Sequence, residues 1–236
     1  MGTRQVNISS NSAESLKHIA AGPISIFGED PTILSEIYKD NVNMSVWCRD
    51  LNHEILQAAN HVIDKDPQLR TSIKVSPKNA IRLIEQKIDN AKITAPLVYD
   101  IFHLVKKFCE LFKVNDTNLK LTVLHESMCP RFHVDMLPCR LITTYKGKAT
   151  EWLQHDCIDR SKLGIGNQGK PDDESGLFKS VNDVKRLAKG DVAIMKGENW
   201  IDNEGRGLVH RSPYIDNENS RLLVSLDFAS SKPEII

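Results

Sequence analysis

The stretch CPRFHVDMLPCRLITTY, residues 129–145, places potential metal ligands directly ahead of an alternating, strand-like run. His133 and Asp135 are two residues apart, so in an extended chain both side chains project to one face and can reach one small ion. An imidazole nitrogen paired with a carboxylate oxygen suits Fe(II), Mn or Zn. A second histidine would complete a facial triad of two histidines and one carboxylate, which leaves other coordination positions open for small molecules.

Three further histidines lie in the C-terminal half of the chain, namely His125, His155 and His210. We expect His210 to join the pair, because it lies between glycines and a run of turn formers that precedes the last apolar strand. We expect His125 to be a strand-end or exposed residue and His155 to lie in a loop. The identity of the metal stays open, since these ligands accept iron, zinc and manganese alike.

Arg221 is the charged residue that opens the last apolar strand, SRLLVSLDFA. The rigid guanidinium fork is a natural partner for a carboxylate in a confined pocket, so Arg221 is a candidate anion-binding residue. The competing interpretation is a salt bridge at the start of the strand, with Asp191 or Asp227 as the acid.

The cysteines around His133 provide an alternative reading of the same stretch. A zinc-binding module could use Cys129, His133, Cys139 and Cys157 as ligands. Structural zinc sites usually show two close pairs such as CxxC, and the spacing here is irregular. Cys129 or Cys157 beside a histidine could also act as a nucleophile, although no residue stands out as the third member of such a site.

The first half of the chain has helical periodicity. Apolar residues recur at helical spacing over residues 51–63 and form a broad stripe over residues 96–113. Between these segments, SPKNAIRLIEQKID begins with a serine that can cap a helix and a proline that suits its first turn. Residues 43–49, NMSVWCR, are typical of a short strand. We therefore expect a helical N-terminal region over residues 1–115.

The pattern changes from residue 118 onward. LKLTVLHE and CRLITTYKG alternate, while GDVAIMKG and SRLLVSLDFA are typical of buried strands. GIGNQG spells GxGxxG but does not stand between a strand and a helix, so we interpret it as a flexible loop and not as a nucleotide site. The sequence predicts an α+β protein in which the helical region packs on an all-β half, residues 118–230, as one compact unit.

The composition narrows the range of partners. Lys and Arg number 31 and Asp and Glu number 31, so no net field draws the chain to nucleic acid or anionic lipid. No apolar run approaches the roughly 20 residues that span a bilayer, and the N-terminus lacks the apolar core of a signal peptide. Five cysteines without a CxxC pair favour a reducing compartment. We expect a cytoplasmic protein that binds neither nucleic acid nor membranes.

The order of the motifs resembles that of Fe(II)/2-oxoglutarate-dependent oxygenases, in particular the prolyl-hydroxylase branch. The HxD pair, the distal His210 and then Arg221 follow the order of that family, and a Gly-Asp-apolar strand, KGDVAIMKG, precedes the distal histidine. This resemblance spans residues 118–229. Over most of its length the chain is also similar to an uncharacterised bacterial domain family with the signature FHVD…RL…TYKG…TEWL.

The oxygenase resemblance implies a double-stranded β-helix, or jelly roll, and a hydroxylase that uses Fe(II) and 2-oxoglutarate. It implies that His133, Asp135 and His210 hold the iron and that Arg221 binds the distal carboxylate of 2-oxoglutarate. Tyr145, at the end of the strand that follows the HxD pair, would add a hydroxyl to that carboxylate. The protein would orient the substrate and exclude water while the cofactors supply the reactive chemistry.

One position departs from the family pattern. Some oxygenases carry a serine two residues after the arginine, where this chain has Leu223. A third class of function stays open, a jelly-roll binding protein without catalysis, because a fold does not imply its function. The substrate, a small molecule or a protein side chain, is not specified by the sequence.

Overall fold

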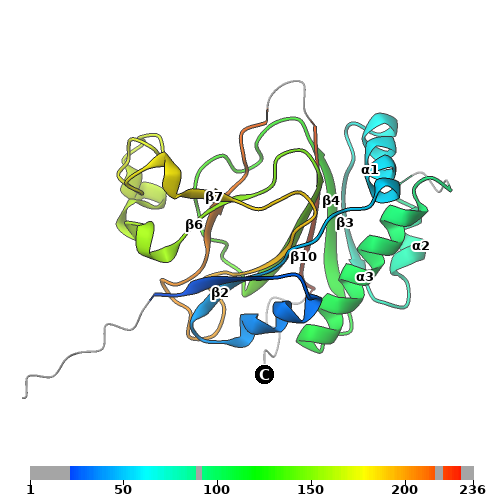
Figure 1. The fold of residues 1–236 in the computed structure, drawn as a ribbon, viewed down its shortest axis with the longest axis horizontal. Coiled ribbons are helices and arrows are strands. Elements are labelled where there is room, and N and C mark those ends of the chain that lie inside the picture. The colour runs from blue at the N-terminus through cyan, green and yellow to red at the C-terminus, as the bar shows by residue number, and fades with distance from the viewer. Residues whose placement is uncertain (1–21, 89–91, 216–219, 230–236) are drawn as a thin grey trace, which may run out of the picture.

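The computed structural model describes residues 22–88, 92–215 and 220–229. Within these residues the chain forms two β-sheets, and helices cover the outer face of the larger sheet (Figure 1). The elements in chain order are β1 (Ile24–Gly28), a 3-10 helix (Pro31–Tyr38), β2 (Val42–Trp47), α1 (His53–Lys65), β3 (Arg70–Val75), α2 (Ala80–Glu85), α3 (Ala95–Phe112), β4 (Thr117–Leu124), β5 (Cys139–Lys146), β6 (Glu151–Leu153), β7 (Val184–Arg186), β8 (Val192–Lys196), β9 (Val209–Arg211) and β10 (Arg221–Phe228). Short 3-10 turns lie between β6 and β7.

The larger sheet has the strand order β1-β2-β8-β5-β10-β4-β3, and the smaller sheet has the order β7-β6-β9. The paired strands run antiparallel, except β1 and β2, which are parallel. Strand β10 lies between β4 and β5 inside the larger sheet, and every one of its residues is buried. The last strand of the chain is therefore a fixed central element, and its side chains can be held accurately on both faces.

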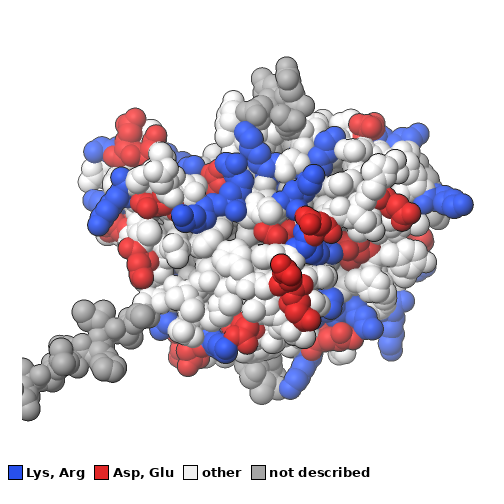
Figure 2. Space-filling model, in the orientation of Figure 1, with Lys and Arg blue, Asp and Glu red and all other residues white. Residues whose placement is uncertain are grey.

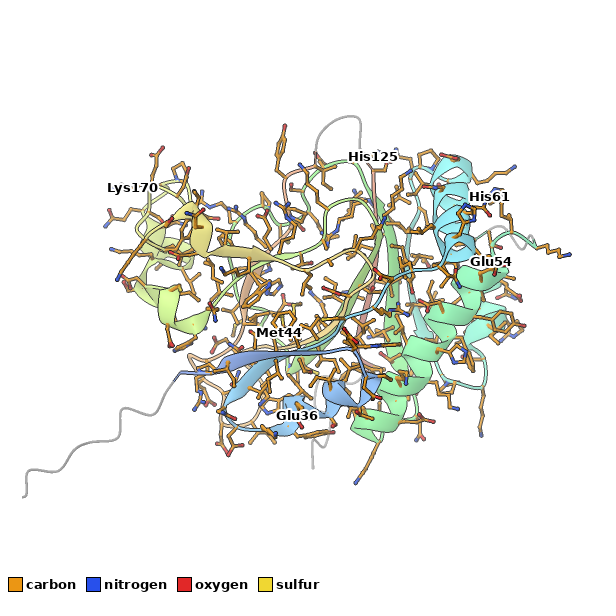
Figure 3. All side chains as sticks on the ribbon, in the orientation of Figure 1. Glu36, Met44, Glu54, His61, His125 and Lys170 are labelled. Atoms are coloured by element: carbon orange, nitrogen blue, oxygen red, sulfur yellow. The ribbon has the colours of Figure 1, made fainter. Side chains whose placement is uncertain are left out.

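Alternation along the strands divides the side chains of the larger sheet between two cores. Toward the smaller sheet, Met44 and Leu223 pack with Trp152 of β6. Side chains fill the space between the two sheets, and Met44 lies among them (Figure 3). Toward the helices, Leu141 and Leu222 belong to the main hydrophobic core with α1 and α3. The larger sheet is buried on both faces, which explains the apolar runs in its central strands.

The N-terminal region, expected to be helical over residues 1–115, contains both helices and strands in its described residues, 22–88 and 92–115. Strand β2 confirms the strand predicted at residues 43–49, but β1 and β3 were not predicted, and all three strands belong to the larger sheet. Strands β1 and β3 form its two edges, where short or polar strands are common. The sequence of β3, RTSIKV, alternates between exposed and more buried side chains, but its polar residues hide the pattern.

The predicted helices are present with small shifts at their ends. Helix α1 begins after Asn52, whose side chain accepts a hydrogen bond from the backbone N–H of Ile55 at 2.9 Å. Helix α3 has a proline in its first turn and buries one apolar stripe against the sheet. Helix α2 begins at Ala80, later than predicted, because the Asn79 side chain accepts from the backbone N–H of Ser76 at 2.8 Å in the turn before it.

The surface carries charges of both signs. On the face shown in Figure 2, basic and acidic side chains are interspersed, which agrees with their equal numbers in the sequence. Among the described residues, no helix has the length and apolar character that crossing a bilayer requires.

Candidate metal centre

A backbone pairing brings the two distant histidines together. His133, in the loop between β4 and β5, forms an isolated antiparallel bridge with His210 of β9. Each residue donates its backbone N–H to the carbonyl of the other at 3.0 Å, so the pair is locked at the edge of the smaller sheet. The two imidazole rings lie 4.6 Å apart between centroids. The convergence of the histidines therefore follows from strand pairing.

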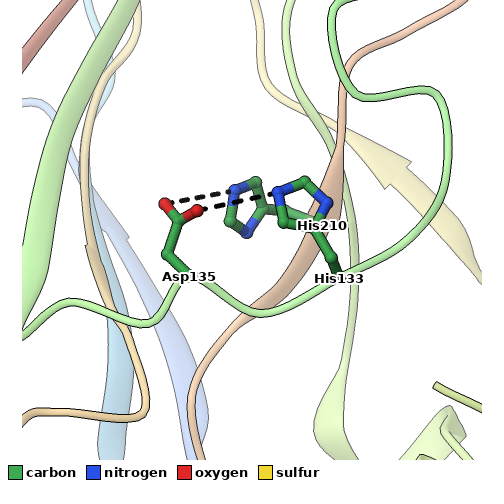
Figure 4. A group of neighbouring side chains, drawn as sticks. All are labelled: His133, Asp135 and His210. Carbon is green, nitrogen blue, oxygen red and sulfur yellow. Dashed lines mark ion pairs between the residues drawn. The ribbon is translucent and has the colours of Figure 1, made fainter. Parts of the chain in front are cut away.

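Asp135 faces both imidazoles (Figure 4). Its Oδ1 lies 3.6 Å from Nε2 of His133 and its Oδ2 lies 3.7 Å from Nε2 of His210. Ligand atoms that are about 2.0–2.2 Å from a shared ion lie about 3–3.5 Å from each other, so these separations are slightly wider than in a metal-bound set, and small side-chain movements would bring all three ligands onto one ion. Within the described part of the chain, this is the one group of three or more histidine, cysteine, aspartate or glutamate side chains close enough to bind a metal together.

Backbone carbonyls set the tautomer of both histidines. Nδ1 of His133 lies 2.9 Å from the carbonyl oxygen of Arg131, and Nδ1 of His210 lies 3.2 Å from that of Leu208. A carbonyl oxygen only accepts, so each Nδ1 carries the proton and each Nε2 presents a lone pair toward Asp135. Two lone pairs that face a carboxylate repel it unless a cation lies between them, and the donor set therefore fits a divalent metal.

The protonation states of His210 and Asp135 agree with a metal-binding role, whereas at His133 a metal would have to displace a proton that Asp135 favours. Burial lowers the pKa of His210 to about 4, so its imidazole is neutral at physiological pH. Asp135 raises the pKa of His133. Burial acts to raise the pKa of Asp135, but His133, His210 and Arg140 outweigh it and hold that pKa below its usual value. A neutral imidazole and an ionised carboxylate are the forms that bind metals.

Arg221 is buried and has no acidic partner among the described residues. Its side chain is 1% exposed and donates hydrogen bonds to Oγ1 of Thr144 at 3.0 Å and Oγ1 of Thr150 at 2.8 Å. Burial lowers its pKa to about 10. Neither acid of the competing interpretation pairs with it, because Asp227 binds Arg140 and Lys120 while Asp191 accepts from the backbone N–H of Ala188. A buried guanidinium without an acid is costly unless an anion completes it.

Arg221 and the histidines line the same cavity, which has a volume of about 150 Å³. Its wall includes His133, His210, Arg140 and Thr150. The cavity therefore connects a potential metal site to a cation that pairs with no acid in the described part of the chain, which is the arrangement needed to bind a small ligand with a metal-binding end and an anionic end.

Tyr145 does not line this cavity, contrary to the expectation from the oxygenase resemblance. Its side chain points to the opposite face of β5, is fully buried, and donates a hydrogen bond to Asp100 of α3, which Arg49 also binds. Strand alternation explains the difference, since Thr144 and Arg140 occupy the cavity face of β5.

We predict that Tyr145→Phe destabilises the fold without affecting the cavity. The substitution removes a buried hydrogen bond to a carboxylate, so we expect the free energy of unfolding to fall by about 1–3 kcal/mol. Denaturant unfolding measures this loss. The affinities for Mn(II) and for 2-oxoglutarate should equal those of the parent. A large decrease in either affinity would show that Tyr145 contributes to the site.

The cysteines do not form the alternative zinc site. Cys139 is fully buried in the core on the helix side of β5, whereas Cys129 is exposed at the cavity and Cys157 lies in the 3-10 turn after β6. Only His133 of the proposed zinc ligands belongs to the candidate metal group.

We therefore expect Cys129→Ser and Cys157→Ser to bind the same amount of metal as the parent, as measured by metal analysis after dialysis. Loss of metal in either variant would restore the zinc reading.

Two residues of the site were not identified from the sequence as part of it. Arg140 donates from Nη1 to Oδ2 of Asp135 at 2.8 Å, and Asp227 binds the other side of the same guanidinium. The alternation of CRLITTYK already places Arg140 and Thr144 on one face, but the sequence did not show which face holds the cavity.

Comparisons with solved structures find likeness at low sequence identity. A dioxygenase for auxin oxidation from rice has a TM-score of 0.49 and 11% identity, over 90% of this chain and 84% of that chain. A prolyl-4-hydroxylase from Pseudomonas putida has a TM-score of 0.44 and 8% identity, over 84% and 96%. AviO1 from Streptomyces viridochromogenes has a TM-score of 0.46 and 11% identity, over 87% and 98%. Because these scores are low, we base no functional argument on them.

Comparisons at the level of sequence place the chain in a family. No curated protein matches it. The model of the family described as "Protein of unknown function (DUF1826)" matches residues 28–227, which is most of the chain. The chain therefore belongs to this family.

Proposed function

We propose that the protein is a non-haem Fe(II)/2-oxoglutarate-dependent oxygenase. The observation that supports this most directly is the joint geometry of one cavity. Two histidines that converge with Asp135 line it at one place, and a buried arginine with no acidic partner among the described residues lines it at another. The order of these residues in the sequence also resembles that family. Neither feature alone is specific, but the combination provides for both the metal and a dicarboxylate.

His133, Asp135 and His210 would hold the iron. The Nδ1 contacts to backbone carbonyls keep both Nε2 lone pairs directed at the ion, and Arg140 holds the carboxylate in place. Bound iron(II) would supply the oxidising chemistry with 2-oxoglutarate and O2 as co-reactants: one oxygen atom of O2 would enter succinate as 2-oxoglutarate loses carbon dioxide, and the other would enter the hydroxyl group formed from a substrate C–H bond.

Arg221 would bind the distal carboxylate of 2-oxoglutarate. Thr144 and Thr150 accept from its guanidinium and so fix the direction of the fork. At a position as buried as that of Arg221, a guanidinium–carboxylate pair is stronger than in solution, and its two-point geometry selects a carboxylate over a neutral group. The cavity volume of about 150 Å³ suits a small dicarboxylate.

The fold proposal follows from the same residues. We propose that the two facing sheets contain the double-stranded β-helix expected for residues 118–230, with the N-terminal strands extending the larger sheet. The substrate, a small molecule or a protein side chain, would approach through the open side of the cavity. The free cysteines favour the cytoplasm as the location.

Spectroscopy and product analysis test this function. Addition of Fe(II) and 2-oxoglutarate without oxygen should give a weak visible charge-transfer band, and admission of oxygen should then release succinate in slow turnover even without the substrate. A protein that binds 2-oxoglutarate but releases no succinate is a binding module. A protein that gives neither the band nor succinate is not a 2-oxoglutarate oxygenase.

A further inference from the structure

Arg140 lies between two carboxylates on the cavity face of β5. From Nη1 it donates to Oδ2 of Asp135 at 2.8 Å. Nε and Nη2 donate to the two oxygens of Asp227 at 2.7 and 2.9 Å, so this second contact is bidentate. The Arg140 side chain is 20% exposed and those of Asp135 and Asp227 are 16% and 13% exposed, so these are partly buried, charge-assisted hydrogen bonds.

Strand pairing fixes the position of this arginine. Asp227 of β10 is the direct cross-strand partner of Arg140 in the antiparallel pair of β10 and β5. Lys120 of β4 also binds Asp227, from Nζ to Oδ2 at 3.1 Å. Asp227 thus ties together three neighbouring strands and sets the direction of the guanidinium. The rest of the fork then points at Asp135, which lies in the loop before β5.

The two oxygens of Asp135 have different surroundings. Each oxygen lies near one imidazole, Oδ1 at 3.6 Å from Nε2 of His133 and Oδ2 at 3.7 Å from Nε2 of His210, but only Oδ2 also accepts a hydrogen bond from Arg140. A carboxylate can bind a metal through one oxygen or through both. A charge-assisted hydrogen bond that holds one oxygen favours binding through the other alone, because chelation by both would require this bond to lengthen.

We propose that Arg140 is a positioning residue that keeps Asp135 a single-oxygen ligand of the metal. This inference rests on the proposed metal site. Three single-atom ligands leave half of the positions of an octahedral ion open, enough for a chelating keto acid and one further small molecule. A carboxylate that bound through both oxygens would fill one of those positions. Arg140 thereby controls how many positions stay available for ligands.

A purely structural role for Arg140 makes a different prediction. If the arginine only joined β5 to β10, its loss would lower stability and leave the metal unaffected. Arg160 provides the matched control, since it donates to Glu198 at 2.8 Å and its side chain is 21% exposed, close to the value for Arg140, but it does not line the cavity. Arg160→Gln therefore removes a comparable ion pair that involves no metal-ligand side chain; the backbone N–H of Glu198, which donates to the carbonyl of Asp135 at 3.0 Å, is kept in this variant.

Titration of the metal-free protein with Co(II) tests the proposal, because the visible absorption of bound Co(II) reports its coordination number and geometry. We expect Arg140→Gln to weaken Co(II) binding by about 10- to 100-fold, the range for loss of a group that orients a metal ligand, and to change the absorption spectrum. Arg160→Gln should match the parent in both. Equal affinity and an unchanged spectrum in Arg140→Gln would overturn the proposal.

Two further variants cover the case in which Arg140→Gln does not fold. Arg140→Lys keeps the charge but cannot hold both carboxylates in a fixed fork, so we expect an intermediate affinity. Asp227→Asn keeps the arginine but weakens its anchor, and we expect a smaller shift in the same direction. Parent values for both variants would equally overturn the proposal.

The Co(II) experiment uses neither 2-oxoglutarate nor oxygen, so it separates this proposal from the oxygenase function. A parent that binds Co(II) with a spectrum dependent on Arg140 but never releases succinate refutes the oxygenase and supports the role of Arg140. If the parent releases succinate but the Co(II) affinity and spectrum of Arg140→Gln are unchanged, the oxygenase function is supported and the proposed role of Arg140 is refuted. A parent that binds no metal refutes both.

Discussion

We expect His210→Ala to abolish the stabilisation of the fold by added Mn(II). The parent should gain stability when Mn(II), a redox-inactive substitute for Fe(II), is added, by about 2.7 kcal/mol at a concentration 100 times the dissociation constant. The variant loses one of three ligands, so its affinity should fall by more than the roughly 10- to 100-fold that follows loss of a group outside the coordination sphere. Thermal unfolding with and without Mn(II) measures the difference, and succinate release should disappear with it.

His125→Ala is the matched control for this result. His125 lies at the end of β4, where one ring nitrogen contacts the carbonyl of Pro67 at 2.7 Å, and it is not part of the metal group. Without metal, His210→Ala removes a neutral imidazole and its hydrogen bond to the Leu208 carbonyl. The free energy of unfolding of metal-free His210→Ala should therefore fall by only about 1–3 kcal/mol. Full Mn(II) stabilisation in His210→Ala, or its loss in His125→Ala, would contradict the assignment of the site.

The sequence was sufficient to nominate the three potential metal ligands that the structure brings together. His133 and Asp135 are two apart, a spacing that places both on one face of extended chain, and the structure brings His210 opposite them through a backbone bridge. Arg221 was identified because a charged residue at the start of an apolar, buried strand requires an anionic partner or ligand. These signals depend on residue type and local spacing, so they can be recognised without knowing the tertiary structure.

The sequence was not sufficient to show which face of a strand meets the cavity. Strand β5 is buried on both sides, so both faces carry apolar residues and periodicity does not distinguish them. The oxygenase resemblance therefore assigned Tyr145 to the cavity, whereas in the structure Tyr145 lies on the opposite face of β5 and Arg140 lines the cavity. The edge strands β1 and β3 were missed for a related reason, since short edge strands bury little and show a weak apolar pattern.

Arg221→Met separates stability from ligand binding. If Arg221 binds a carboxylate of 2-oxoglutarate, its loss leaves that carboxylate buried without a counter-charge, which costs about 3–5 kcal/mol. The affinity for 2-oxoglutarate, measured by titration in the presence of Mn(II), should therefore fall on the order of 10²- to 10³-fold or more. The affinity for Mn(II) alone should not change, because the metal ligands are intact. A variant that binds 2-oxoglutarate as the parent does would exclude Arg221 from the cosubstrate site.

The effect of Arg221→Met on stability should have the opposite sign. The folded protein lowers the pKa of Arg221 to about 10, below the usual value for arginine, so folding disfavours its charged form at every pH below about 10. Methionine has a similar length and carries no charge, and the metal-free variant should be at least as stable as the parent. Arg160→Met should instead destabilise the protein, because it leaves Glu198 without its cation, while 2-oxoglutarate binding stays intact. A cation that lowers the stability of the fold yet is required for ligand binding is retained for function and not for stability. A destabilised Arg221→Met variant would instead show that Arg221 is part of the structural core.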